Sequence, residues 1–174
     1  MKKYNLIRQF TLTFLIGLFS LTSTAKDISD DEKRQRIEAM IVDIEAEFAV
    51  PEVNVSTAQR LVAQQGFLLI DVREPKEIHV STIPGSITQQ QFEANPAAYK
   101  SKKIIAYCTI GYRSSKFAKN WNKQGFNISN LRGSLLLWTH ANGPLIDNQG
   151  KPTHQMHVYG RKWNLLPAGF QSVY

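Results

Sequence analysis

The chain has 174 residues, 43% of them hydrophobic, with one cysteine and a formal net charge of +7. A single cysteine cannot form an intramolecular disulfide, which excludes the small disulfide-stapled folds of many secreted proteins. Nucleic acid would suit the positive charge. However, the sequence contains no recognisable nucleic-acid module and its N-terminus indicates export, so we expect no nucleic-acid partner.

Residues 1–25 have the pattern of a secretory signal peptide. A basic N-terminus precedes a largely apolar run over residues 10–21, and Ser23-Thr24-Ala25 offers small residues where a signal peptidase cleaves. A membrane anchor is the alternative interpretation, but a spanning helix needs about 20 apolar residues. The sequence therefore predicts a periplasmic protein with no stable membrane insertion after cleavage.

Residues 26–50 are predicted to form an N-terminal accessory helix. Ser29 and Glu32 have the spacing of a capping box, and Pro51 is expected to end the helix. The apolar positions between them follow helical spacing: Ile37, Met40, Ile41, Ile44 and Phe48. We expect this stripe to dock on the following domain, and a partner-binding helix stays open as the alternative.

Apolar runs alternate with helical patterns through residues 51–146, which predicts one α/β domain with a parallel sheet covered on both faces. Ser56 is the expected cap of the first helix in this region. The predicted strands are 67–70, 104–107 and 128–131, and the predicted helices are 57–65, a short one from Pro75, 92–99, 114–124 and 135–142. Ligands bind at the carboxyl ends of strands in such sheets, and Cys108 lies at one of these ends.

The C-terminal extension, residues 147–174, is too apolar for a disordered tail, so we expect it to pack on the domain. His154 and His157 have no cysteine or acid close by in the sequence, and packing or surface positions are the better interpretation. No metal and no cofactor are therefore predicted. The three tryptophans, Trp121, Trp138 and Trp163, are interpreted as core residues.

The segment from Cys108 to Arg113 carries the predicted chemistry. It joins a buried strand to a helix start, where backbone N–H groups and the helix dipole favour a thiolate. Gly111 permits a tight turn, and Arg113 adds a fixed cation. Residues 100–174 hold 11 basic and 1 acidic side chains, a balance expected to attract small anions. Cys108 is the candidate catalytic residue, and the candidate substrate-binding residues are Thr109, Ile110, Gly111, Tyr112, Arg113 and Ser114.

These motifs resemble the rhodanese (sulfurtransferase) family over about residues 53–146. Three stretches carry the resemblance: Leu69-Ile70-Asp71-Val72-Arg73-Glu74-Pro75-Lys76-Glu77 with Ile83-Pro84-Gly85-Ser86-Ile87, then Tyr107 to Ser115, then Gly125-Phe126 with Asn130-Leu131-Arg132-Gly133 and Trp138. The chain departs from the family pattern at Ser81-Thr82, at Ile78 and at Gly133-Ser134, where Gly-Gly is usual. These departures affect loop geometry and leave the nucleophile in place.

The resemblance implies a rhodanese-like domain over residues 51–146, an open parallel sheet of about five strands with helices on both faces. It also implies a thiosulfate sulfurtransferase-like enzyme. Cys108 would take sulfane sulfur from a small anionic donor such as thiosulfate, hold it as a persulfide, and pass it to a thiol acceptor or cyanide. Asp71 and Arg73 would give structural support through ion pairs.

The cysteine loop permits other interpretations. Cysteine-dependent phosphatases use a Cys-x5-Arg loop, whereas four residues separate Cys108 from Arg113, so phosphatase and arsenate reductase activity are disfavoured. An inert packed cysteine would not explain the glycine and arginine at these spacings. A non-catalytic binding, sulfur-carrier or thiol-redox module in the periplasm stays open as the alternative function.

Overall fold

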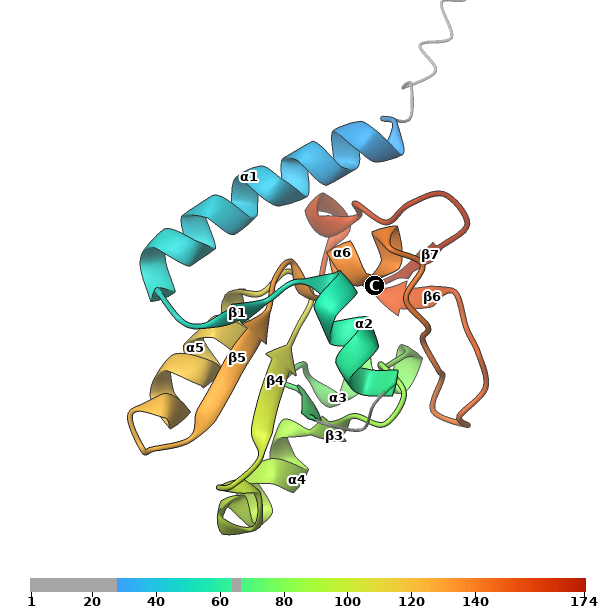
Figure 1. The fold of residues 1–174 in the computed structure, drawn as a ribbon. Helices are drawn as coiled ribbons and strands as arrows, with labels where there is room; N and C mark the ends of the chain where they lie inside the picture. Colours follow the sequence, from blue (N-terminus) through green and yellow to red (C-terminus); the bar gives the residue numbers. More distant parts are fainter. Residues whose placement is uncertain (1–27, 64–66) are drawn as a thin grey trace, which may run out of the picture.

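Residues 28–63 and 67–174 are described in the computed structural model (Figure 1). The predicted signal peptide lies outside these residues. The helices are α1 (Asp30–Phe48), α2 (Val55–Ala63), α3 (Pro75–Val80), α4 (Gln89–Ala94), α5 (Tyr112–Asn122) and α6 (Ser134–His140), with 3-10 helices η1 (Pro96–Tyr99) and η2 (Arg161–Trp163). Within the described ranges, no helix has both the length and the apolar character that crossing a bilayer requires.

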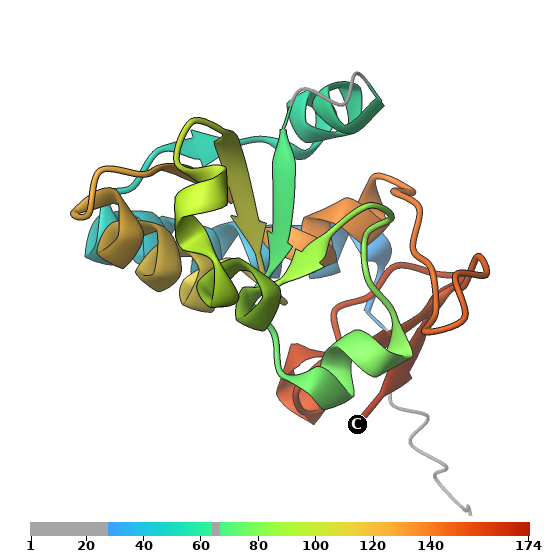
Figure 2. The same ribbon diagram turned by 90° about the horizontal axis from the view of Figure 1, so that it is seen from below.

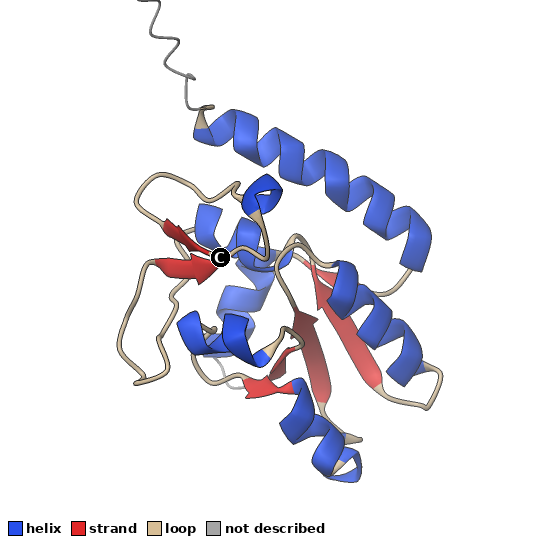
Figure 3. Cartoon of the chain, turned by 180° about the vertical axis from the view of Figure 1, so that it is seen from behind, coloured by secondary structure: helices blue, strands red, loops and turns tan. Residues whose placement is uncertain are grey.

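Five parallel strands form the central sheet. They are β1 (Glu52–Val53), β2 (Leu68–Asp71), β3 (Ile87–Thr88), β4 (Lys103–Tyr107) and β5 (Asn127–Leu131), in the spatial order β1-β5-β4-β2-β3. Helices cover both faces (Figure 3), so the predicted α/β class and sheet are confirmed. Strands β1 and β3 were not predicted, because a strand of two residues is too short to show an alternating pattern.

Successive residues of the central strands supply two separate cores. Leu69 and Ile105 pack with α1, α2, α6 and the C-terminal extension, whereas Ile70 and Ala106 pack with α4 and α5. This division follows from the two-residue period of a strand, whose side chains point to opposite faces. Both faces are buried, which is why these strands read as continuous apolar runs. Cys108 belongs to the α4–α5 side.

Helix α1 crosses beyond the carboxyl ends of the strands (Figures 1 and 2). Ser29 caps it by accepting the Glu32 N–H at 3.2 Å, which is one half of the predicted capping box, and the Glu32 carboxylate accepts from Arg36 instead. The helix ends at Phe48, before Pro51, because Ala49 adopts a left-handed conformation with φ of 49°. The apolar stripe of α1 is buried against the domain. Arg132 also attaches the helix to the domain by donating to Glu38 and Glu45, each at 2.7 Å.

The C-terminal extension packs on the domain beside α3 (Figure 2). Its strands β6 (Gln155–His157) and β7 (Gln171–Val173) pair in parallel, and its side chains in the hydrophobic core are Met156, Val158, Leu165 and Leu166. His154 packs on Phe170 with ring centroids 5.1 Å apart. His157 Nδ1 accepts the Tyr159 N–H at 3.0 Å. Among the described residues, no three metal-ligating side chains come together.

Several helix boundaries differ from the predictions, and three of the differences have a clear local cause. Helix α2 is capped by Asn54, whose Oδ1 accepts the Thr57 N–H at 2.9 Å, and not by Ser56. The predicted helix 92–99 is two elements, α4 and η1, because Asn95 leaves helical geometry before Pro96. Helix α5 begins at Tyr112 instead of Ser114, so Arg113 lies within its first turn.

Candidate active site

Cys108 directly follows β4 and faces the first turn of α5. Its thiol is buried with 1% residue exposure, and Sγ accepts the Gly111 N–H at 3.2 Å. Ser114 Oγ lies 3.6 Å from the same sulfur. Gly111 has φ of 118°, a conformation that L side chains rarely adopt, and this conformation turns the chain from the loop into the helix. Helix α5 therefore presents its amino-terminal donors to Sγ.

The start of α6 holds the backbone of the cysteine loop. Ser134 Oγ accepts the Cys108 N–H at 3.1 Å, and the Leu135 and Leu136 N–H groups donate to the carbonyls of Cys108 and Thr109. Ser134 adopts φ of 46°. It thus keeps the left-handed conformation that suits the glycine usual at this position, and its hydroxyl adds a bond that glycine cannot make. The departure at Gly133-Ser134 therefore braces the loop.

Arg113 is paired with Glu77 of α3. Its two terminal nitrogens donate to the two carboxylate oxygens at 2.6 and 2.8 Å. Thr109 Oγ1 joins the network at 3.3 Å from Glu77 and 3.2 Å from Arg113. The Glu77 side chain is fully buried, whereas that of Arg113 is 30% exposed. Burial raises the pKa of Glu77, but the Arg113 guanidinium and the Glu74 N–H lower it more, so the carboxylate stays charged.

The electrostatics of the site favour a thiolate. Burial raises the pKa of the Cys108 thiol, but the positive charge of Arg113 and the hydrogen-bond donors of Ser114 and Gly111 lower the pKa by more than burial raises it. Its pKa therefore lies below the ordinary value of a thiol. A thiolate, unlike a thiol, is a nucleophile towards sulfur.

Asp71 and Arg73 form a second buried ion pair. Arg73 Nη2 and Nε donate to the two Asp71 oxygens at 2.6 and 2.9 Å, and Arg73 also donates to the Ser81 carbonyl. Neither residue lines the cavity over Cys108. Thr82 Oγ1 donates to Asp71 at 3.0 Å and contacts the buried Tyr107 hydroxyl at 2.7 Å, so the pair ties the loop after α3 to β4.

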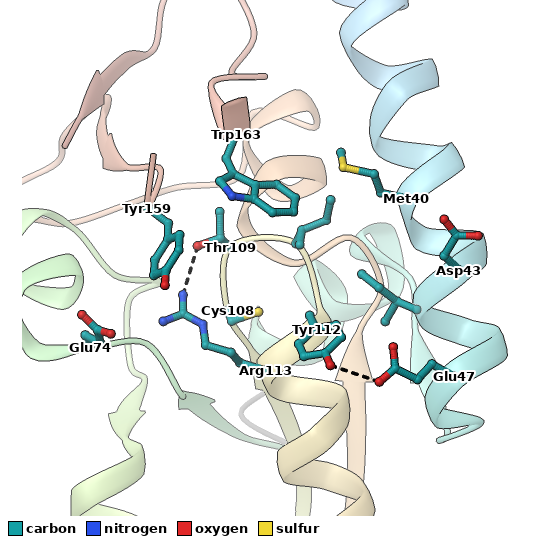
Figure 4. Close-up of a pocket in the computed structure, with 12 residues that line it drawn as sticks. Met40, Asp43, Glu47, Glu74, Cys108, Thr109, Tyr112, Arg113, Tyr159 and Trp163 are labelled. Atoms are coloured by element: carbon teal, nitrogen blue, oxygen red, sulfur yellow. Dashed lines mark hydrogen bonds between the residues drawn. The ribbon is translucent and has the colours of Figure 1, made fainter. Parts of the chain in front are cut away.

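A cavity of about 540 Å³ opens over Cys108 (Figure 4). The loop contributes Thr109, Ile110, Tyr112 and Arg113 to its wall, so most of the predicted loop residues meet at one place. Gly111 and Ser114 lie beneath them, against the sulfur. Tyr112 donates its hydroxyl to Glu47 of α1 at 3.0 Å, which links the loop to the accessory helix.

The rest of the cavity wall comes from outside the loop. Met40, Asp43, Ile44 and Glu47 line it from α1, Glu74 from the turn before α3, and Tyr159 and Trp163 from the C-terminal extension. Trp163, which was interpreted as a core residue, packs half-buried against the core and also lines the cavity. Helical spacing did place Met40 and Ile44 on one face of α1, but nothing in the sequence indicated that this face would meet Cys108.

The charge around the cysteine also differs from the expectation. The sequence places Cys108 among the basic residues 100–174. The fold, however, brings over it helix α1, which belongs to residues 26–99, where 13 side chains are acidic and 7 are basic (Figure 4). Asp43, Glu47 and Glu74 line the cavity, and Arg113 is the one cation among the described residues of its wall. Since Arg113 is already neutralised by Glu77, the described wall is acidic overall.

Comparison with known proteins gives consistent matches. The model of the rhodanese-like domain family matches residues 54–141. A sulfurtransferase of Allochromatium vinosum is 30% identical over 100 residues, covering 55% of this chain and 92% of the relative. The putative sulfurtransferase YtwF of Bacillus subtilis is 29% identical, covering 52% and 93%. The crystal structure of a thiosulfate sulfurtransferase from Pseudomonas aeruginosa shares the fold, with a TM-score of 0.54, 21% identity, and coverage of 71% of this chain and 24% of that one.

Proposed function

The chain belongs to the rhodanese-like domain family, and on that premise we propose that it is a sulfurtransferase that carries sulfane sulfur on Cys108. The observation that carries the proposal is the environment of the thiol. Its sulfur accepts the Gly111 N–H at 3.2 Å, its pKa is lowered beside Arg113, and it lines an open cavity. A buried cysteine that served packing alone would have no need of a cavity or of these donors.

The proposed reaction has two displacements. The Cys108 thiolate attacks the outer sulfur of an anionic donor such as thiosulfate, forming a new S–S bond. The S–S bond of the donor breaks, and its electron pair leaves with sulfite. A thiol or cyanide then attacks the terminal sulfur of the persulfide, and the electron pair of the breaking bond returns to Cys108. The enzyme ends as the starting thiolate, so the cycle needs no oxidant or reductant.

The loop donors suit both charged states of this cycle. The Gly111 N–H and the start of α5 face the sulfur and would stabilise the thiolate and the terminal sulfur of the persulfide. Each terminal nitrogen of Arg113 donates to Glu77, and Nη2 also donates to Thr109. We therefore assign Arg113 to bracing the loop and supplying positive charge, instead of binding the donor directly.

The proposed location is the periplasm, where the pattern of residues 1–25 would direct the chain. A thiol there meets an oxidising environment, and without a second cysteine the protein needs an external thiol to resolve a mixed disulfide. Fractionation of cells that express the full chain tests the location. Recovery of uncleaved protein in the cytoplasm would contradict it.

Intact-mass analysis after incubation with thiosulfate tests the reaction. We expect the protein to gain the mass of one sulfur atom and to lose it when a thiol is added. The Cys108→Ser variant should neither gain sulfur nor transfer it to cyanide. The matched control is Ser115→Ala, which alters a buried hydroxyl on α5 that has no hydrogen-bond partner within the described part of the chain. No mass gain with thiosulfate or an organic persulfide donor would contradict the proposal, as would hydrolysis of a phosphate ester dependent on Cys108.

A further inference from the structure

Half of the cavity wall lies outside the residues matched by the family model. Six of the twelve lining residues come from α1 and the C-terminal extension, whereas the family model covers residues 54–141. Both added segments are fixed to the domain. Arg132 ties α1 to β5, and the guanidinium of Arg113 lies 5.5 Å from the centre of the Tyr159 ring. The added segments therefore form part of the cavity wall around the sulfur (Figure 4).

The cavity is larger and more apolar than thiosulfate or cyanide requires. Its volume of about 540 Å³ is in the range of sites for organic ligands. Met40, Ile44 and Ile110 give an aliphatic surface, and Tyr159 and Trp163 give an aromatic one. An ion of a few atoms would leave this surface in contact with water. A ligand with a hydrocarbon or aromatic part would cover it and gain the free energy of apolar burial.

The charged groups at the cavity favour one sign of ligand charge. Asp43 and Glu47 lie one turn apart on α1, and Glu74 faces them from the other side of the cysteine loop (Figure 4). Glu74 has Lys76 as an exposed partner at 3.4 Å, and Lys119 approaches the backbone carbonyl of Glu47 at 3.4 Å. Neither lysine lines the cavity. The carboxylates of α1 would thus attract a cation and repel an anion near the sulfur.

We propose that the acceptor of the Cys108 sulfur is a small organic thiol that carries a positive charge next to an apolar part. The positive group would lie against Asp43 and Glu47, and the apolar part against Met40, Ile44 and Trp163. The inference rests on the proposed sulfur transfer and names the substrate class of its second step. The acceptor sulfur bonds to the terminal sulfur of the persulfide, the bond to Cys108 breaks, and its electron pair restores the Cys108 thiolate. The acceptor's proton stays with the new persulfide or passes to water.

Charged thiol reagents test the selection independently of sulfur transfer. Aminoethyl methanethiosulfonate is cationic, sulfonatoethyl methanethiosulfonate is anionic, and both modify a thiolate directly. After each rate is divided by that for free 2-mercaptoethanol, the cation should react with Cys108 at least about tenfold faster than the anion. The variant Asp43→Asn with Glu47→Gln should lower this ratio about tenfold. The amide introduced by Glu47→Gln keeps an oxygen for the Tyr112 hydroxyl, so the loop stays supported.

The matched control is Asp31→Asn with Glu32→Gln, which removes the same two charges from exposed positions in the first turn of the same helix. It should leave the ratio within about twofold of the wild type, because screening by salt weakens distant charges. A ratio near one in the wild type, or the same ratio in all three proteins, would overturn the inference. Equal urea midpoints for the variants would exclude unfolding as the cause.

Sulfur-transfer assays give a second test, in which the α1 double variant should weaken the preference for a cationic acceptor but speed the reaction with an anionic donor. With the persulfide already formed, cysteamine should accept sulfur faster than 3-mercaptopropionate, and the α1 double variant should reduce that preference. The same variant should form the persulfide from thiosulfate faster than the wild type, since a repulsive charge has been removed. Loss of both rates would indicate damage and would count against the inference. If no persulfide forms with any donor, the sulfurtransferase proposal fails, and the reagent ratio still decides the charge selection.

Discussion

Replacing Arg113 by methionine should destabilise the whole domain, because it leaves Glu77 as an isolated buried charge. Glu77 is fully buried and receives both Arg113 nitrogens at 2.6 and 2.8 Å. Removing one partner of a buried ion pair costs about 3–5 kcal/mol. Glu77 keeps the Glu74 N–H at 3.0 Å and Thr109 at 3.3 Å, and Arg113 is partly exposed, so we expect a smaller loss, about 2–3 kcal/mol.

The effect has a characteristic pH dependence. In the wild type the pKa of Glu77 is depressed, so its pairing stabilises the fold above the ordinary carboxyl pKa and is lost as the pH falls through the lowered pKa. In Arg113→Met, burial without the partner raises the Glu77 pKa. The carboxylate then takes up a proton at a higher pH than in the wild type, which removes the uncompensated buried charge. The stability difference between the two proteins should therefore shrink as the pH falls below neutrality.

Urea unfolding at several pH values measures these quantities, with the double variant Arg113→Met and Glu77→Gln as the matched comparison. The glutamine fills the same space without the charge, so the double variant should recover a large part of the loss at pH 7. A loss below about 0.5 kcal/mol, or a loss that is equal with glutamine at position 77, would refute the buried-charge argument.

Three further outcomes are expected. The rate of Cys108 alkylation by iodoacetamide should reach half its maximum at a pH below 9.0, the ordinary pKa of a thiol. In Arg113→Met this midpoint should move to a higher pH, because the positive charge that lowers the pKa is gone. An unchanged midpoint would show that Arg113 does not stabilise the thiolate. Gly111→Ala should lower the free energy of unfolding by more than about 1 kcal/mol and slow alkylation, because φ is 118° and the new Cβ would lie 3.1 Å from the Asn130 side chain. The control is Gly150→Ala, where φ is 77° but no atom lies within 4 Å of the new Cβ, so it should show the backbone strain alone. Arg73→Met should cost about 3–5 kcal/mol by stranding Asp71, as urea unfolding will show, while the reagent charge ratio at Cys108 stays at the wild-type value.

The parts of the fold that the sequence predicts well are those set by local patterns. Buried strands such as β2 and β4 read as apolar runs, and Gly111 marks the turn into α5. Boundaries were harder to place where two local signals competed. Asn54 and Ser56 are both good caps, and the helix begins at the first of them because Asn54 Oδ1 accepts the Thr57 N–H. The two-residue strands β1 and β3 depend on pairing with β5 and β2, which no local pattern records.

The same distinction separates the two halves of the candidate site. The cysteine loop is local in sequence, so six consecutive residues suffice to indicate a thiolate and its donors. Glu77 is distant from Arg113 along the chain, and only the folded α3 shows that the arginine is already paired. A sequence motif can therefore name the cation at a site without revealing whether that cation is free to bind a ligand.

The acidic wall of the cavity depends on packing in the same way. Counting charges along the chain put Cys108 in a basic half, yet the electric field at a site depends on which elements pack around it. Helix α1 brings Asp43 and Glu47 to the cavity although both lie far from Cys108 in the sequence. The chemistry at the sulfur is then set by the architecture of the sheet and loop, and the choice of ligand by segments added at either end. Substitutions in α1 should accordingly change which thiols react and leave the thiolate itself intact.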